Sequence, residues 1–159
     1  MKVLLALLLF GGLGGLVNAQ SVADYFSRIP TQSFTEGAPQ QLVNLAKNGQ
    51  GFVDRKNGFL HLDGDGAQVS LQVALFRFED KSPLLIVAWG NLEEPDFTHL
   101  TIFREAGGKM VKANRNILPV ADSEGLRFEL PRHGRTIVIR SPAGRAISKW
   151  TWNGTEFSH

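Results

Sequence analysis

From Phe52 to Phe157, apolar residues alternate with polar ones in short runs that are separated by turn residues. A period of two is that of a β-strand, in which successive side chains point to opposite faces of a sheet. The runs are about 5–8 residues long and recur roughly every ten residues, with Gly, Pro, Asn and Asp between them. Such short connections favour antiparallel hairpins over parallel crossovers. The pattern predicts an all-β fold, mainly an antiparallel meander, arranged as a small sandwich or an open barrel.

The individual strands can be assigned from the turns between them. Lys56-Asn57-Gly58 divides residues 51–62 into a hairpin, because Asn-Gly readily supplies the positive φ values of a tight turn. Residues 69–78 and 84–89 are expected to form the next antiparallel pair, and the continuous apolar run at 84–89 is typical of a strand buried on both faces. Further strands are expected at residues 99–105, 110–113, 126–130, 136–140, 146–152 and 155–157.

Residues 20–50 have a helical spacing instead. The apolar residues of the first segment lie three or four positions apart and share one face of a helix, which Pro30 ends. A second helix is expected from Pro39 to Lys47, with Gly49 just beyond its end. We expect one or two short helices that pack on the β domain of residues 51–159, within a single globular domain. The residues of the first helical face are Val22, Tyr25, Phe26 and Ile29.

The first 19 residues are typical of a secretory signal peptide. Lys2 precedes an apolar run at residues 3–17, which contains four glycines and is shorter than the about 20 residues that span a membrane. Small residues follow, as a signal peptidase requires. We expect cleavage after Ala19, which leaves Gln20–His159 in the periplasm or outside the cell without a stable membrane span. The alternative is a retained N-terminal anchor.

Charge and cysteine content exclude several classes of protein. The chain has 17 Lys and Arg against 15 Asp and Glu, a formal net charge of +2, and no cysteine. Without cysteine there are no disulfides, thiolate zinc sites, iron–sulfur clusters or cysteine nucleophiles. The near balance of charge does not point to a nucleic-acid surface, and we expect no nucleic-acid partner.

Three tryptophans are candidate binding residues. Trp150 and Trp152 share one face of the C-terminal strand, and Trp89 lies on another strand. Exposed, they would form a stacking platform for the sugar rings of an envelope glycan or for the apolar surface of an envelope protein. Buried, they would be core residues, the more ordinary role of large aromatic side chains in a sheet.

The sequence from His61 to Gly66 contains the candidate metal ligands, Asp63 and Asp65. Two carboxylates two positions apart, each followed by Gly, resemble the opening of a calcium loop. However, Ala67 occupies the place of the third ligand, and the bidentate Glu of such a loop is missing. Asp and Gly are also the ordinary residues of tight turns, so a plain turn is the favoured interpretation and no cofactor is expected.

Two other charged segments have a chemical interpretation. Glu93-Glu94-Pro95-Asp96 could provide the paired carboxylates of a glycosidase, although bunched carboxylates on a loop are usually only solvated. The C-terminal third is basic and could attract an anionic envelope component, but a mixed solvent-exposed face explains it equally. The basic residues are Arg127, Arg132, Arg135, Arg140, Arg145 and Lys149.

The strands and turns account for nearly every conspicuous residue, so the sequence favours a non-catalytic binding or interaction module of the bacterial envelope. One alternative is a small envelope hydrolase whose site is assembled from His61, Asp63, Asp65 or His99. The other is a domain stabilised by calcium. Convergence of those four side chains in one cleft would favour the hydrolase, whereas scattered positions would favour binding.

Overall fold

The computed structural model describes residues 20–90, 96–120 and 125–159. All paired strands are antiparallel and form two sheets, one of six strands and one of four. In both sheets each strand pairs with its neighbour in sequence, as in a meander. The predicted all-β antiparallel class is therefore confirmed. The predicted signal segment 1–19 and the acidic residues Glu93 and Glu94 lie outside the described residues.

The six-stranded sheet contains the first hairpins of the β region. Its central strand β4 is buried along its whole length except at Trp89, which is half-buried. This agrees with the continuous apolar run that predicted a strand covered on both faces. The strands are β1 (Gly51–Asp54), β2 (Phe59–Leu62), β3 (Leu71–Arg77), β4 (Pro83–Trp89), β5 (His99–Ala106) and β6 (Lys109–Lys112).

The four-stranded sheet is formed by the C-terminal part of the chain. It follows a short 3-10 turn, η3 (Arg115–Ile117), and only one of its faces is apolar. Trp152 of β9 is opposite Phe157 of β10 and belongs to the inner face. The strands are β7 (Arg127–Glu129), β8 (Thr136–Arg140), β9 (Ala146–Trp152) and β10 (Phe157–Ser158).

Two short helices precede the sheets, as the spacing of apolar residues predicts. Helix α1 begins after Ser21, whose side chain accepts a hydrogen bond from the backbone N–H of Asp24, while the Asp24 carboxylate accepts one from the backbone N–H of Ser21. This capping box satisfies two N–H groups that the helix leaves unpaired. The elements are α1 (Val22–Ser27), η1 (Thr31–Ser33), α2 (Pro39–Leu45) and η2 (Ala46–Gln50).

The second helix ends earlier than predicted. Its α-helical part stops at Leu45, and the chain continues through η2, a single wider turn. Gly49 has a φ of 100° in that turn, a value that glycine adopts without strain. The predicted end signal at Gly49 is therefore in the right place, but the backbone reaches it through a different helical geometry.

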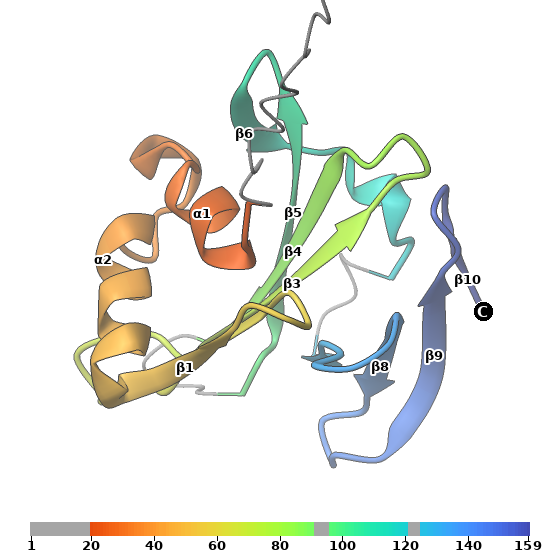
Figure 1. The fold of residues 1–159 in the computed structure, drawn as a ribbon. Helices are drawn as coiled ribbons and strands as arrows, with labels where there is room; N and C mark the ends of the chain where they lie inside the picture. The colour runs from red at the N-terminus through yellow and green to blue at the C-terminus, as the bar shows by residue number, and fades with distance from the viewer. Residues whose placement is uncertain (1–19, 91–95, 121–124) are drawn as a thin grey trace, which may run out of the picture.

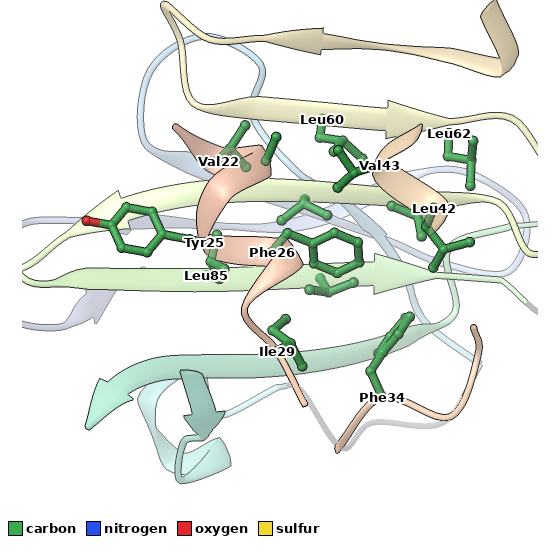
Figure 2. Close-up of a cluster of buried hydrophobic side chains, with 14 of the residues drawn as sticks. Val22, Tyr25, Phe26, Ile29, Phe34, Leu42, Val43, Leu60, Leu62 and Leu85 are labelled. Carbon is green, nitrogen blue, oxygen red and sulfur yellow. The ribbon is translucent and has the colours of Figure 1, made fainter. Parts of the chain in front are cut away.

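The molecule has three layers. The two helices cover one face of the six-stranded sheet, and the four-stranded sheet covers the other (Figure 1). Each interface has its own apolar cluster. The helix-side cluster joins α1 and α2 to residues such as Leu60 and Leu85, as Figure 2 shows. The sheet-side cluster lies between the two sheets and includes Ile86, Phe128 and Trp152.

Candidate functional site

A polar groove with a volume of about 1020 Å³ opens at the side of α1. Its walls come from segments that are far apart in the sequence, namely α1, α2, η2, the turn between β1 and β2, the end of β3, the residues that precede β8, and the end of β9. Only a few of the lining residues are apolar. The charged residues that line the groove are Asp24, Arg28, Lys47, Arg55, Lys56, Arg77 and Arg135.

The charge of this groove differs sharply from that of the chain as a whole. Its walls carry six positive side chains and one negative side chain, a formal excess of five, whereas the complete sequence has a net charge of only +2. A hollow lined by one sign of charge concentrates the electrostatic field and attracts counter-ions. We call this feature the basic groove.

The hairpin between β1 and β2 supplies two of these cations. Asn57 donates hydrogen bonds from its backbone N–H and its side-chain amide to the Asp54 carboxylate, at 3.1 and 2.9 Å. Gly58 closes the turn with a φ of 66°, and its carbonyl accepts a hydrogen bond from the N–H of Leu75 at 2.8 Å. The turn is thereby attached to β3, and its tip presents Arg55 and Lys56 to the groove.

Two arginines of the groove are held on Tyr25. The guanidinium carbons of Arg28 and Arg77 each lie 5.5 Å from the centroid of its ring, a distance at which a cation is attracted to the ring face. Figure 2 shows Tyr25 at the margin of the helix-side cluster, with its hydroxyl pointing away from the other labelled side chains. Tyr25 therefore packs in the helix-side cluster and also positions the guanidinium groups of Arg28 and Arg77.

Further hydrogen bonds restrain the same two arginines. Arg28 donates to the Glu105 carboxylate at 2.7 Å and to the carbonyl of Gly108 at 2.6 Å. Arg77 donates to the carbonyl of Lys81 at 3.0 Å. Because their geometry is already set, these two guanidinium groups would lose little freedom on binding a ligand.

Among the described residues that line the groove, Asp24 is the one carboxylate. Hydrogen bonds from Ser21, first from its backbone N–H and then from its hydroxyl, lower the pKa of Asp24, and the charges of Arg55 and Lys47 lower it further. Asp24 therefore stays ionised but is occupied by the helix cap. Among the described residues no carboxylate forms an ion pair with Lys47, Arg55, Lys56 or Arg135.

The structure does not bring the three tryptophans together. Trp89 packs on the helix-side cluster and stacks on His99, with ring centroids 4.3 Å apart. Trp152 is 1% exposed in the sheet-side cluster and donates its indole N–H to the carbonyl of Arg77 at 2.8 Å. Trp150 is half-buried beside that cluster and donates to Ser148. No shared platform exists, because Trp89 and the other two lie on opposite faces of the six-stranded sheet.

The proposed hydrolase residues are also dispersed. His61 Nε2 lies 2.8 Å from the Asp63 carboxylate, on the face of the sheet that carries Phe59. His99 is opposite Trp89 and lies on the helix side. Asp65 accepts hydrogen bonds from the backbone N–H groups of Ala67 and Gln68, as in a capped turn.

Asp63 and Asp65 thus have separate partners. Within residues 20–90, 96–120 and 125–159, no three His, Cys, Asp or Glu side chains come together as a metal site would require. In the same part of the chain, none of the helices is long and apolar enough to cross a bilayer.

Three of the six cations named from the C-terminal third form ion pairs. Arg127 pairs with Asp96, Arg132 with Asp54, and Arg140 with Glu129, at N–O distances of 2.7–2.9 Å. Of the six basic residues named from the sequence, only Arg135 lines the basic groove. The other cations of the groove come from the first half of the chain.

The sequence contains only a weak signal for the other cations of the basic groove, which sequence reasoning did not identify as site residues. Arg55 and Lys56 occupy the tip of a recognisable Asn-Gly hairpin, so their exposure could have been inferred. Arg28, Lys47 and Arg77 are separated by about twenty to thirty residues in sequence, and only the tertiary fold brings them to one wall.

Comparison with protein-family models, curated proteins and solved structures found no match to this chain. The chemistry of the basic groove is therefore the basis for a function.

Proposed function

We propose that this chain is an exported, non-catalytic binding module of the bacterial envelope, and that it holds an anionic ligand in the basic groove. The observation that carries this proposal is the convergence of six cations from distant segments around a single, already occupied carboxylate. Positive charges that repel one another destabilise a fold slightly, and an anionic ligand relieves that repulsion.

The side chains of the groove are suited to binding more than to catalysis. Four of the six cations are arginines, whose guanidinium groups stay protonated and cannot act as general bases. Their planar forks form paired hydrogen bonds with phosphate or carboxylate groups. The dispersal of His61 and His99 over opposite faces of the sheet removes the shared centre that the hydrolase alternative needed.

The size and charge of the groove favour a ligand with several phosphate groups. Because Glu105 already pairs with Arg28, about four positive charges of the groove remain to be balanced. A phosphate ester carries about −1.5 to −2 charges at neutral pH, so about two to three such groups balance them, whereas about four carboxylates would be needed. The volume of about 1020 Å³ is at the upper end of small-molecule sites and accommodates more than a single phosphate. Gln40, Ser27 and Asn57 add neutral hydrogen-bonding groups that suit sugar hydroxyls. A phosphorylated envelope glycan fits these requirements.

Export is supported by the sequence of the first 19 residues, with cleavage expected after Ala19. Expression of the full chain in a bacterium, followed by fractionation and mass spectrometry, tests this part. We expect a periplasmic or secreted protein that begins at Gln20. A protein that keeps its first 19 residues would contradict it.

Binding is tested by calorimetric titration with fructose 1,6-bisphosphate at low salt, with citrate and glucose as comparisons. We expect the bisphosphate to bind more tightly than citrate and glucose not to bind. The double variant Arg55→Glu/Lys56→Glu should weaken binding about tenfold or more, because two attractive charges become repulsive.

The matched control is Arg145→Glu/Lys149→Glu, which makes the same change in charge at two exposed residues outside the groove. It should bind as the unaltered protein does. Equal losses in the two double variants would mean that net charge alone attracts the ligand, and this would contradict a specific site.

A further inference from the structure

Gln20 is the first described residue, and it forms part of the wall of the basic groove. Its side-chain carbonyl accepts a hydrogen bond from Nη1 of Arg28 at 3.0 Å, and its backbone carbonyl accepts one from Nη2 of Arg77 at 3.4 Å. The next residue, Ser21, caps α1. Gln20 is thus held beside both of the arginines that lie on Tyr25.

This position coincides with the expected cleavage site. A peptidase that cuts after Ala19 makes Gln20 the first residue and converts its backbone nitrogen from a neutral amide into an α-amino group, which carries a positive charge at neutral pH. We propose that removal of the signal peptide completes the anion site, and that the ammonium group of Gln20 is its seventh positive group. This inference rests on the proposed function of the basic groove.

Cleavage changes the chemistry of that nitrogen in two ways. In the precursor it has one N–H donor and no charge, whereas in the mature chain it has three donors and a full positive charge. The mature protein should therefore bind the anion more tightly than any form with a blocked or extended terminus.

Asp24 offers the new ammonium an alternative partner inside the protein. One oxygen of this carboxylate already accepts hydrogen bonds from the N–H and the hydroxyl of Ser21, both at 2.7 Å. An internal pair with Asp24 would stabilise the fold without contributing to the ligand. Affinity and thermal stability must therefore both be measured.

The experiment compares three forms of the mature chain: one with a free Gln20 terminus, one acetylated at the α-amino group, and one extended by Gly-Ser. Each is titrated calorimetrically with fructose 1,6-bisphosphate, and its melting temperature is recorded. We expect the acetylated form, which loses the charge, to bind about three- to tenfold more weakly, the range expected for one partly screened charge. The extended form keeps an ammonium group but moves it two residues away from Gln20, so it should also bind more weakly, and the melting temperatures should be unchanged. Lys149→Gln removes one exposed charge outside the groove and should leave affinity unchanged.

An N-terminal glutamine can cyclise, in which case the α-nitrogen bonds to the side-chain Cδ and ammonia leaves. The product has no charge at this nitrogen, so it should bind as weakly as the acetylated form does. Mass spectrometry identifies it by the loss of ammonia, and fully cyclised protein provides a second neutral form for comparison.

Four other results of these measurements would contradict the role of the Gln20 ammonium group. Equal affinity of the free and acetylated forms, with binding still lost in Arg55→Glu/Lys56→Glu, would overturn this inference and leave the proposed function standing. A lower melting temperature with unchanged affinity would assign the ammonium to Asp24 and also overturn it, as would an exported chain that begins at another residue. Absence of binding by all forms would remove the proposed function as well.

Discussion

The cations of the four-stranded sheet and those of the basic groove are the same residue types in two different settings. Arg127, Arg132 and Arg140 each face a carboxylate at hydrogen-bonding distance. In the groove wall, Arg28 is the cation that has such a partner among the described residues, through Glu105. The first group stabilises the contacts between segments, whereas the second leaves positive charge available to a ligand.

The position of the acids, more than the number of bases, distinguishes a structural surface of this protein from a binding surface. Arg140 has Glu129 of the same sheet beside it, and Arg127 and Arg132 have Asp96 and Asp54 from outside that sheet, so the charges cancel locally. The walls of the groove carry one acid, and the helix cap already engages it. The net charge of +2 for the complete sequence does not reveal that paired and unpaired positive charges lie in different parts of the molecule.

Among substitutions that test the difference between the two groups of cations, we expect the largest effect on ligand affinity and stability at Arg77. Arg77→Met removes a groove charge together with the hydrogen bond to the Lys81 carbonyl and the contact with Tyr25. We expect about tenfold weaker binding of fructose 1,6-bisphosphate and a loss of about 1 kcal/mol in the free energy of unfolding. Calorimetry and urea unfolding measure the two quantities.

Arg135→Met is the companion to that variant. Arg135 is exposed and lines the groove, so this change should weaken binding without altering stability. If both variants lost stability but neither lost affinity, the groove arginines would be structural, and the two groups of cations would not differ in role.

A smaller effect, on stability alone, is expected at Arg132. This residue pairs with Asp54 at 2.9 Å, and its guanidinium lies 4.7 Å from the centroid of the Phe52 ring. Arg132→Met should lower the melting temperature slightly, because the pair is exposed and screened by solvent, and should leave binding unchanged. Arg145→Met is the control, since it removes an exposed charge and should change neither quantity. A fall in affinity for Arg132→Met would contradict the division between the two groups.

The smallest effect is a pH dependence at the same pair. Hydrogen bonds from Asn57 and then from Arg132 lower the pKa of Asp54 to about 2. A carboxyl whose pKa is lowered by folding stabilises the protein above its unfolded pKa of about 4, and that stability is lost as the pH falls towards about 2. Asp54→Asn should therefore flatten the fall in melting temperature between about pH 4 and pH 2. Parallel acid curves for the two proteins would show that the pair contributes nothing.

The fold could be predicted from the sequence because its signals are local. Alternation within each run, and Asn-Gly or Pro between runs, define hairpins that need no knowledge of the rest of the chain. The helix that contains Tyr25 and Phe26 was equally visible, since its spacing repeats within two turns. The η2 turn after Leu45 was missed because its i→i+5 hydrogen bonding has no distinct pattern of residues.

The site was much less predictable. Alternation correctly places Trp150 and Trp152 on one face of a strand, but it cannot relate that face to the face of Trp89, which depends on how the layers stack. The groove cations belong to elements whose proximity is decided by packing. The C-terminal basic residues that the sequence offers as an attraction for an anionic component include only Arg135 among the residues of the groove.

Strand β4 is buried on both of its faces, and this determines how the molecule unfolds. Leu85 and Val87 belong to the helix-side cluster, whereas Leu84 and Ile86 belong to the sheet-side cluster, so a single strand is shared by both interfaces. Detaching either outer layer would expose one whole side of this strand to water, at a cost that the remaining layer cannot offset. The three layers should therefore melt together in one transition, with equal calorimetric and van't Hoff enthalpies, and the groove should persist until the entire molecule unfolds.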